Sequence, residues 1–325
     1  MYFIAIAVGL ILLLILWSQI EQTLLVTSKY KIRSEKLNHG VQLRFVVLSD
    51  LHNHSLGKNN EKLIHKVDSI RPDFIVIAGD LITKRQACYP SNAFTLLKNL
   101  SKKYKIYYGY GNHELYFERL LDDIDNLQSD DTDRKRREAL YSTWVEYKSQ
   151  LKKLGIIFLE NQSLSVHLSS DKSTIDHDRG NSNSMSAVND GESMLMIHGL
   201  SLSTQFYKRG ERETLTQETL TASLGEPKDD SFHLLIAHNP IYFNEYTTWG
   251  ANLTISGHVH GGLVRLPFFG GLISPQIALF PKFDAGRFTK DGKDMIISRG
   301  LGTHSCMLRL FNPPELVIIS LQGEG

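Results

Sequence analysis

Five short apolar runs, each ending in Asp, Asn or His or in a segment that carries them, constrain the fold of this chain more than any other feature. They are rich in β-branched and aromatic residues, as strands buried on both faces of a sheet are. The sequence therefore predicts a layered α/β domain with these runs as its inner strands. The runs are RFVVLSDLH (44–52), DFIVIAGD (73–80), KIYYGYGNHE (105–114), HLLIAHNP (233–240) and NLTISGHVHGG (252–262).

Helical stretches separate the first three runs and indicate βαβ units. Residues 59–70 carry apolar residues at helical spacing, and 93–100 precede the third run. Residues 120–151 are highly charged, which predicts an exposed helical insertion, and the Ser-, Asp- and Asn-rich stretch 168–192 predicts a peripheral excursion. Because the polar residues of all five runs belong to one predicted site, we expect residues 40–325 to form one domain.

The N-terminal segment predicts a membrane anchor. Residues 2–17 contain no charge, and residues 18–20 extend them to about the 20 residues that a bilayer core requires. A cleaved signal peptide is the main alternative, but no Lys or Arg precedes the apolar run and no A-x-A pattern follows it. A buried core helix is the other alternative. We expect residues 1–20 to be a single-pass anchor and residues 21–39 to be a juxtamembrane linker.

Charge gives the expected orientation and excludes some partners. The first basic residues, Lys29, Lys31, Arg33 and Lys36, follow the apolar segment, which favours a cytoplasmic C-terminal domain. The formal net charge is only +1, so we expect no obligate nucleic-acid partner. Nothing in the sequence indicates an oligomeric state.

Two cysteines are too few for a disulfide framework or a Cys-rich zinc site. A bridge between Cys88 and Cys306 is one reading, and two reduced thiols are the preferred one.

The polar residues after the five runs are suited to metal binding. Asp50 and His52 are two residues apart, as are His258 and His260. An extended backbone would turn both side chains of each pair to the same side. Mixed nitrogen and oxygen donors suit divalent Mn, Fe, Co, Ni or Zn. One carboxylate shared between two ions would leave positions open for water and substrate, as a catalytic site requires. The predicted site residues are Asp50, His52, Asp80, Asn112, His113, His238, His258 and His260.

The ordered motifs D-L-H, G-D, G-N-H-E, H-N-P and G-H-V-H resemble the five-block signature of calcineurin-like metallophosphoesterases. The resemblance implies a two-sheet β-sandwich flanked by helices, with a hydroxide bridging two metal ions as the nucleophile. It assigns one ion to Asp50, His52 and His260, and the other to Asn112, His238 and His258. Asp80 then bridges both ions, and His113 is the general acid.

Segments 256–269 and 298–319 resemble the membrane-associated bacterial branch of that superfamily, in which some members act on the UDP-diacylglucosamine intermediate of lipid A synthesis. The expected substrate is a phosphomonoester, a phosphodiester or a pyrophosphate at the cell envelope. An inactive metal-binding scaffold and a nuclease are the alternatives. The apolar stretch 266–280 could cover a lipid substrate, dip into the bilayer or simply pack.

The remaining polar residues of interest receive ordinary roles. Glu114 is expected to be a local hydrogen-bond partner rather than a ligand. His54, His198, His233 and His304 are expected to be hydrogen-bonded structural histidines, with a phosphate contact as the alternative for His54.

Overall fold

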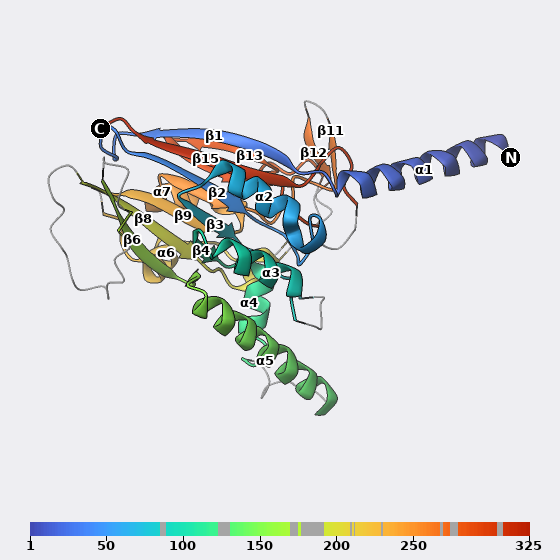
Figure 1. The fold of residues 1–325 in the computed structure, drawn as a ribbon, viewed down its shortest axis with the longest axis horizontal. Helices are drawn as coiled ribbons and strands as arrows, with labels where there is room; N and C mark the ends of the chain where they lie inside the picture. The colour runs from blue at the N-terminus through green and yellow to red at the C-terminus, as the bar shows by residue number, and fades with distance from the viewer. Residues whose placement is uncertain are drawn as a thin grey trace.

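Two β-sheets packed face to face form the centre of the molecule (Figure 1). The structure is a computed structural model, and the predicted two-sheet sandwich flanked by helices is confirmed. It describes residues 1–84, 89–122, 131–169, 175–176, 192–208, 210, 212–228, 230–266, 269–273, 279–303 and 308–325. Cys88, Cys306 and His304 lie outside these residues, as does most of the stretch 168–192.

Sheet 1 has the strand order β1-β15-β2-β3-β4-β5. The first three predicted runs form β2, β3 and β4, which are parallel neighbours. Its strands are β1 (Val26–Ser34), β2 (Gln42–Leu48), β3 (Phe74–Ala78), β4 (Lys105–Gly109), β5 (Ile157–Leu159) and β15 (Glu315–Gly323). The strand β15 pairs in parallel with β1 and antiparallel to β2, so it closes the gap between them.

Sheet 2 has the order β13-β14-β10-β9-β8-β6-β7. The last two predicted runs form β9 and β10, again as parallel neighbours. Its strands are β6 (Gln162–Ser169), β7 (Ile175–Asp176), β8 (Glu192–Leu200), β9 (Phe232–Ala237), β10 (Leu253–Ser256), β13 (Gly286–Lys290) and β14 (Lys293–Ile297). A separate hairpin pairs β11 (Val264–Leu266) with β12 (Gly270–Ile273).

The continuous apolar runs are explained by burial on both faces of each sheet. On β2, Phe45 and Val47 pack between the two sheets, whereas Val46 and Leu48 pack under the helices that cover sheet 1. Phe45 also stacks on Phe74 of β3, with ring centroids 4.8 Å apart. An alternating pattern would have left one of these faces polar.

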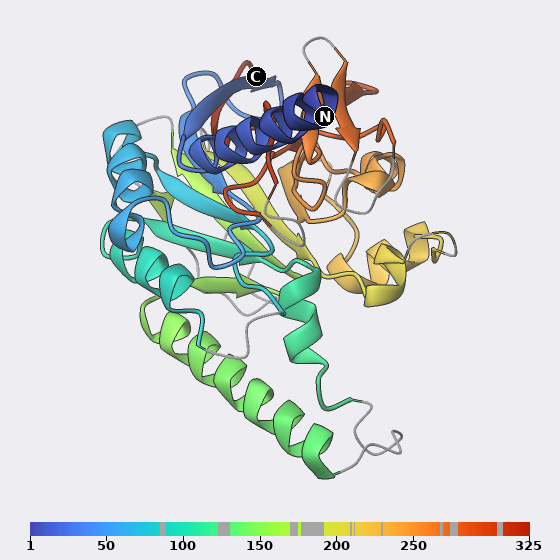
Figure 2. The same cartoon turned by 90° about the vertical axis from the view of Figure 1, so that its right-hand side faces the viewer.

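Helices cover the outer faces of both sheets (Figures 1 and 2). Sheet 1 carries α2 (Glu61–Ile70), α3 (Ser91–Leu100), α4 (Asn112–Glu118) and α5 (Asp131–Lys153), and sheet 2 carries α6 (Gln217–Leu224) and α7 (Phe243–Trp249). Three 3-10 turns, Lys58–Asn60, Thr204–Tyr207 and Pro240–Tyr242, complete the short helical segments among the described residues.

The charged insertion is helical, but the prediction that it is exposed is only partly right. Trp144, Tyr147 and Leu151 of α5 are buried in the core beneath sheet 1's helices. These buried residues lie in the C-terminal half of α5, and the high charge of the whole helix led to the prediction that it is exposed.

The N-terminal helix α1 (Tyr2–Glu21) projects away from the body (Figures 1 and 2). It is long and apolar enough to cross a membrane. Its last turn, in contrast, is docked on the domain. The Arg309 backbone N–H donates to Ser18 Oγ at 2.9 Å, and the Phe311 N–H donates to Glu21 Oε2 at 2.7 Å. The strand β1 follows directly, within the range expected to be a linker.

Candidate metal centre

The structure brings the predicted site residues to the ends of five strands, where parallel sheets place their ligands. Asp50 and His52 follow β2, Asp80 follows β3, and Asn112 and His113 open α4 just after β4. His238 follows β9, while His258 and His260 follow β10. Both sheets therefore contribute to one centre.

The first cluster consists of Asp50, His52 and His260, whose ligand atoms lie within 4.8 Å of one another. The Nε2 atom of His260 is 3.2 Å from Asp50 Oδ1 and 3.0 Å from His52 Nε2. The other carboxylate oxygen, Oδ2, accepts the hydroxyl of Ser49. These are the residues that the resemblance assigned to one metal ion.

The second cluster consists of Asp80, His238 and His258. His238 donates Nδ1–H to the Ala78 carbonyl at 2.6 Å, which turns Nε2 toward Asp80 Oδ2 at 3.0 Å. The same Nε2 is 3.8 Å from Asp50 Oδ1, so the two clusters adjoin. A carbonyl that fixes one ring nitrogen in this way is the usual support of a metal-ligating histidine.

A third overlapping cluster joins Asp80 to His52 and His113. The His113 Nδ1 accepts the Lys84 backbone N–H at 2.8 Å, so the neutral ring carries its proton on Nε2. That nitrogen is 3.9 Å from Asp80 Oδ2. Asp80 and His52 each belong to two of the three clusters, and of the two residues only Asp80 carries the carboxylate that a bridge requires.

Electrostatics hold these groups in the protonation states that metal ligands require. Burial alone would raise the pKa of Asp50 and of Asp80, but the neighbouring imidazoles lower both. Burial lowers the pKa of His258 to about 3, and it also lowers the pKa of His113. The carboxylates are therefore ionised, and these two imidazoles are neutral.

The pKa of His238 is raised by its neighbour Asp80. Burial alone would lower its pKa, yet the charge of Asp80 and the contact between the two groups raise it to about 10. A proton on Nε2 would lie between the imidazole and the carboxylate, which is also where a cation would lie. The fit to a metal is supported by Asn112 Oδ1, which is buried and has no hydrogen-bond partner within the described parts of the chain.

The backbone at the candidate ligands differs from the extended conformation that we expected. Each strand has already ended, and Asp50 and His52 have φ of 50° and 49°. Asp80 (54°), His258 (73°) and His260 (52°) are also left-handed. Non-glycine residues in this region cost free energy and cluster at functional sites, because a tight turn can aim side chains that a strand cannot. The two residues of each pair therefore converge through turns.

Two glycines allow the ligand turns to touch. A Cβ atom added to Gly79, at φ +86°, would lie 2.5 Å from the Gly111 backbone nitrogen. One added to Gly111 would lie 2.1 Å from Asp80 Oδ1. Either side chain would push Asp80 out of the centre.

Glu114 is confirmed as a local hydrogen-bond partner. Its buried carboxylate accepts the backbone N–H groups of Asp80 at 2.8 Å and Gly111 at 3.0 Å, together with the hydroxyl of Tyr108 at 2.8 Å. Burial raises its pKa to about 7. Glu114 thus fastens the turn that carries Asp80 to the turn that carries Asn112.

Three residues near the centre were not predicted. The ring of Tyr207 packs edge-on against His258, with centroids 5.0 Å apart. Asn312 Nδ2 donates to the His260 carbonyl at 2.7 Å, and the fully buried Arg309 donates to the carbonyls of the 299–302 loop. None of these residues follows an apolar run, so the pattern that revealed the ligands could not reveal them.

The structural roles expected of three histidines agree with their surroundings. His198 and His233 bond each other, and His233 Nε2 also bonds the Lys228 carbonyl. His54 interacts with the Gln22 backbone at the end of α1.

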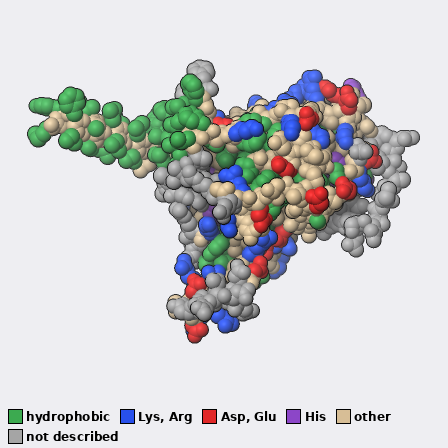
Figure 3. Space-filling view, turned by 180° about the vertical axis from the view of Figure 1, so that it is seen from behind, with side chains coloured by type: hydrophobic (Ala, Val, Ile, Leu, Met, Phe, Trp, Pro, Cys, Tyr) green, Lys and Arg blue, Asp and Glu red, His purple; other side chains and the backbone are tan. Residues whose placement is uncertain are grey.

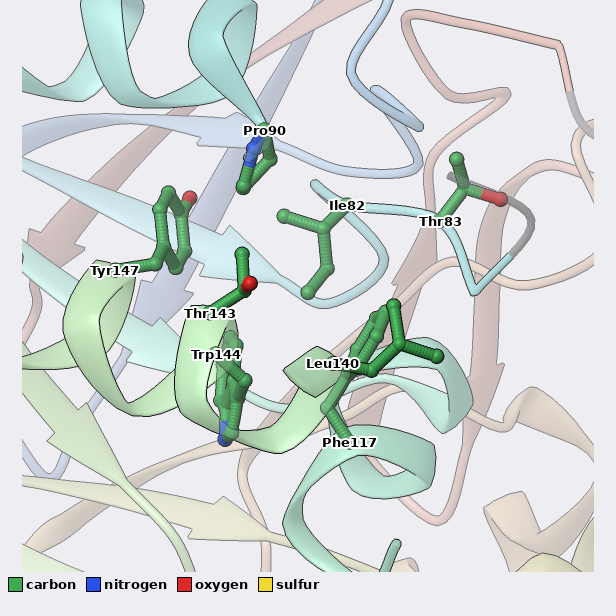
Figure 4. A pocket seen from close by; sticks show the side chains of 8 residues that line it. All are labelled: Ile82, Thr83, Pro90, Phe117, Leu140, Thr143, Trp144 and Tyr147. Carbon is green, nitrogen blue, oxygen red and sulfur yellow. The ribbon is translucent and has the colours of Figure 1, made fainter. Parts of the chain in front are cut away.

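An apolar pocket lies beside the turn that carries Asp80 (Figure 4). Ile82 and Thr83 enter it from that turn, and Trp144 enters it from α5. Its volume is about 20 Å³, roughly the space of one water molecule, so it is a packing gap rather than a ligand site.

A family model described as calcineurin-like phosphoesterase matches residues 43–262, more than half of the chain. The uncharacterized metallophosphoesterase YkuE of Bacillus subtilis is 24% identical over 94% of this chain and 88% of its own length. An uncharacterized metallophosphoesterase of Aquifex aeolicus is 24% identical over 95% of this chain and 96% of its own length. The UDP-2,3-diacylglucosamine pyrophosphatase LpxG of Chlamydia muridarum is 24% identical over 88% of this chain and 85% of its own length.

Proposed function

The chain belongs to the calcineurin-like phosphoesterase family, as its five motifs predicted, and from this premise we propose that it hydrolyses phosphoesters with a dinuclear metal centre. Asp50, His52 and His260 would hold one ion, and Asn112, His238 and His258 would hold the other. Asp80 would bridge the two.

The observation that carries this proposal is the overlap of the clusters. The third cluster shares His52 with the first and Asp80 with the second, and His238 Nε2 lies near both Asp80 and Asp50. Asn112 Oδ1 is buried without a hydrogen-bond partner in the described chain. The donor set of imidazole nitrogens and carboxylate and amide oxygens suits Mn, Fe, Co, Ni or Zn. Such ions would activate water as the nucleophile, as a hydroxide shared between them, and neutralise the charge on the phosphoryl oxygens.

The chain's own residues supply orientation and the proton. The Lys84 amide occupies Nδ1 of His113, so only Nε2 can face a substrate, and it carries the proton there. We assign His113 the role of general acid: Nε2 of the protonated ring would donate its proton to the leaving oxygen, which leaves the ring neutral, the state in which Nδ1 can accept the Lys84 N–H. Glu114 keeps Asp80 and His113 in register, because it binds the turns that carry both.

The substrate class that fits is a phosphomonoester, phosphodiester or pyrophosphate. A second candidate function is a pyrophosphatase acting on a lipid-linked nucleotide, as the name of the LpxG relatives says of them. The observation that favours it is the docking of α1 on the segment 309–311, which connects the proposed anchor to the candidate site. The Arg309 side chain donates to the Gly302 carbonyl, and the Gly302 N–H donates to the Asp50 carbonyl.

We also propose a single-pass anchor at residues 1–20, a juxtamembrane segment at 21–39 that joins sheet 1 through β1, and a phosphoesterase domain at 40–325 on the cytoplasmic side. The exposed apolar surface of α1 and the basic residues after it support this arrangement. Digestion of the domain by protease added outside intact spheroplasts would contradict the cytoplasmic side.

Metal analysis tests the proposal directly. The full chain, purified in detergent without chelator and supplied with Mn²⁺ or Zn²⁺, should bind about two ions per chain, as a two-ion centre requires. It should release phosphate or a nucleoside monophosphate from at least one ester in a panel of nitrophenyl, nucleotide-sugar and lipid-phosphate substrates. A folded protein that binds one ion or none would refute the dinuclear centre.

A further inference from the structure

Large exposed apolar side chains are unevenly distributed over the body of the molecule. Apart from Met1 and α1, the described residues include six of them, and only Val145 on α5 stands apart from the base of α1. The other five, exposed by 43% to 76%, form what we call the apolar collar: Leu24, Phe269, Leu279, Phe280 and Phe311.

A hydrogen bond and a β-bridge connect the collar to the last turn of α1. The Phe311 N–H donates to Glu21, and Leu310 next to it bridges to Val264 of β11. The hairpin partner β12 then receives the Phe280 N–H on its Leu272 carbonyl at 3.0 Å. Figures 1 and 2 show the β11–β12 hairpin beside the base of α1, and in Figure 3 the apolar surface of α1 continues onto the body there.

The surface that covers the collar follows from the geometry of α1. Its 20 residues extend about 30 Å, the thickness of a bilayer core. Buried hydrogen bonds at Ser18 and Glu21 fix the helix to the domain, so the collar lies at the depth where α1 leaves the hydrocarbon. Water-exposed clusters of this kind are uncommon on soluble proteins and mark interaction surfaces.

We propose that the apolar collar lies in the interfacial layer of the lipid bilayer and holds the domain against the membrane at a second place beside α1. This inference rests on the anchor in the proposed function. It makes the membrane contact a broad one, formed by α1, the β11–β12 hairpin and the segment around Phe311.

Photo-crosslinking of the full chain tests the proposal. p-Benzoylphenylalanine is introduced singly at Phe280, at Phe311, at Phe3 in α1 and at Val145 as the matched exposed control. Each protein is reconstituted into vesicles of phosphatidylcholine and phosphatidylglycerol, irradiated and analysed by mass spectrometry. An interfacial contact places side chains ~5–10 Å into the boundary between headgroups and acyl chains. Val145 lies away from the collar, so lipid adducts at Phe280 and Phe311 should exceed those at Val145 by roughly tenfold.

The outcomes separate the collar from the anchor. Lipid adducts at Phe3 with none at Phe280 and Phe311 above the Val145 level would overturn the collar and leave the anchor intact. Adducts from Phe280 to a second copy of the chain would assign the collar to a protein interface and overturn the proposal. Absence of lipid adducts at Phe3 as well would overturn the anchor and the collar together.

Discussion

At the scale of single residues, Asp80 and His113 are joined by a hydrogen bond, but we assign them different roles: Asp80 as the bridging ligand and His113 as the proton donor. Asp80 Oδ1 accepts the His113 N–H at 2.9 Å, while Oδ2 faces His238. His113 faces the same carboxylate through Nε2 at a longer distance. Because His113 also belongs to a possible ligand cluster, its role as proton donor has to be separated from that of a ligand.

His113→Ala should leave metal content nearly intact and lower turnover by about 10²–10⁴-fold, the usual effect of losing a general acid. The loss should shrink for a nitrophenyl ester, whose leaving group needs no proton. Turnover and metal content of the same preparations are the measurements, with Asp80→Ala as the comparison. Asp80→Ala should release metal and abolish activity on every substrate. Equal metal loss in both variants would make His113 a ligand.

The sequence indicated which residues would lie close together better than it indicated their conformations. Each candidate ligand follows a buried strand, and Asp50 and His260 do meet in one cluster. Their left-handed backbone could not be predicted, because it depends on contacts between turns far apart in sequence, such as Gly79 against Gly111. Tyr207 could not be predicted for the same reason, because only the fold brings its ring next to His258.

At the scale of elements, β8 and β9 are joined by a buried histidine pair as well as by their backbones. His198 Nε2 lies 2.9 Å from His233 Nδ1, and Ser163 of β6 lies 2.7 Å from the other nitrogen of His198. Burial lowers the pKa of His198 to about 3, with a smaller effect from His233. This cluster links three neighbouring strands of sheet 2.

The pair predicts acid sensitivity. Above pH 6.5 His198 is neutral in both states, so its protonation does not affect folding. Between pH 6.5 and about 3 the unfolded chain binds a proton that the folded chain excludes, so stability falls by ~1.4 kcal/mol per pH unit. Urea unfolding at fixed metal concentration should show a shallower pH slope for His198→Gln. Exposed His39→Gln should keep the parent slope, and identical slopes in all three proteins would contradict the prediction.

The strands that could be predicted are those buried on both faces. β3, β9 and β10 are buried at every position, and most of their residues are apolar. β1 could not be predicted, because its sequence VTSKYKIRS is mostly polar and it lies at the edge of sheet 1. Its partner β15 is nearly 300 residues away, so no local pattern links them.

At the scale of the whole molecule, α1 has a free part and a docked part. Most of the helix projects from the body, but Ser18 and Glu21 are buried and accept backbone N–H groups of the 309–311 segment. β1 then runs beside β15 for its full length. A boundary for a soluble domain should therefore fall before Ser18.

Two N-terminal deletions test this boundary. A chain lacking residues 2–16 should leave the membrane fraction in an alkaline wash and remain folded. One lacking residues 2–23 should be less stable to urea by about 2–6 kcal/mol, because the Arg309 and Phe311 N–H groups lose their acceptors at ~1–3 kcal/mol each. Equal stability of the two chains would mean that the docked turn contributes nothing.

The place of β15 in sheet 1 also sets the order in which the enzyme can become active. This strand leaves the ribosome after every other described element, yet it fills the gap between β1 and β2, the two first strands to emerge. Its first residue, Glu315, also binds Arg299 and Gly300, which lie against the Asp50 turn. During synthesis the N-terminal helix can enter a bilayer while sheet 1 is still split, so pairing over this sequence distance comes late. We therefore expect the proposed metal centre to load only after β15 has been synthesised, when the proposed anchor can already be in the bilayer.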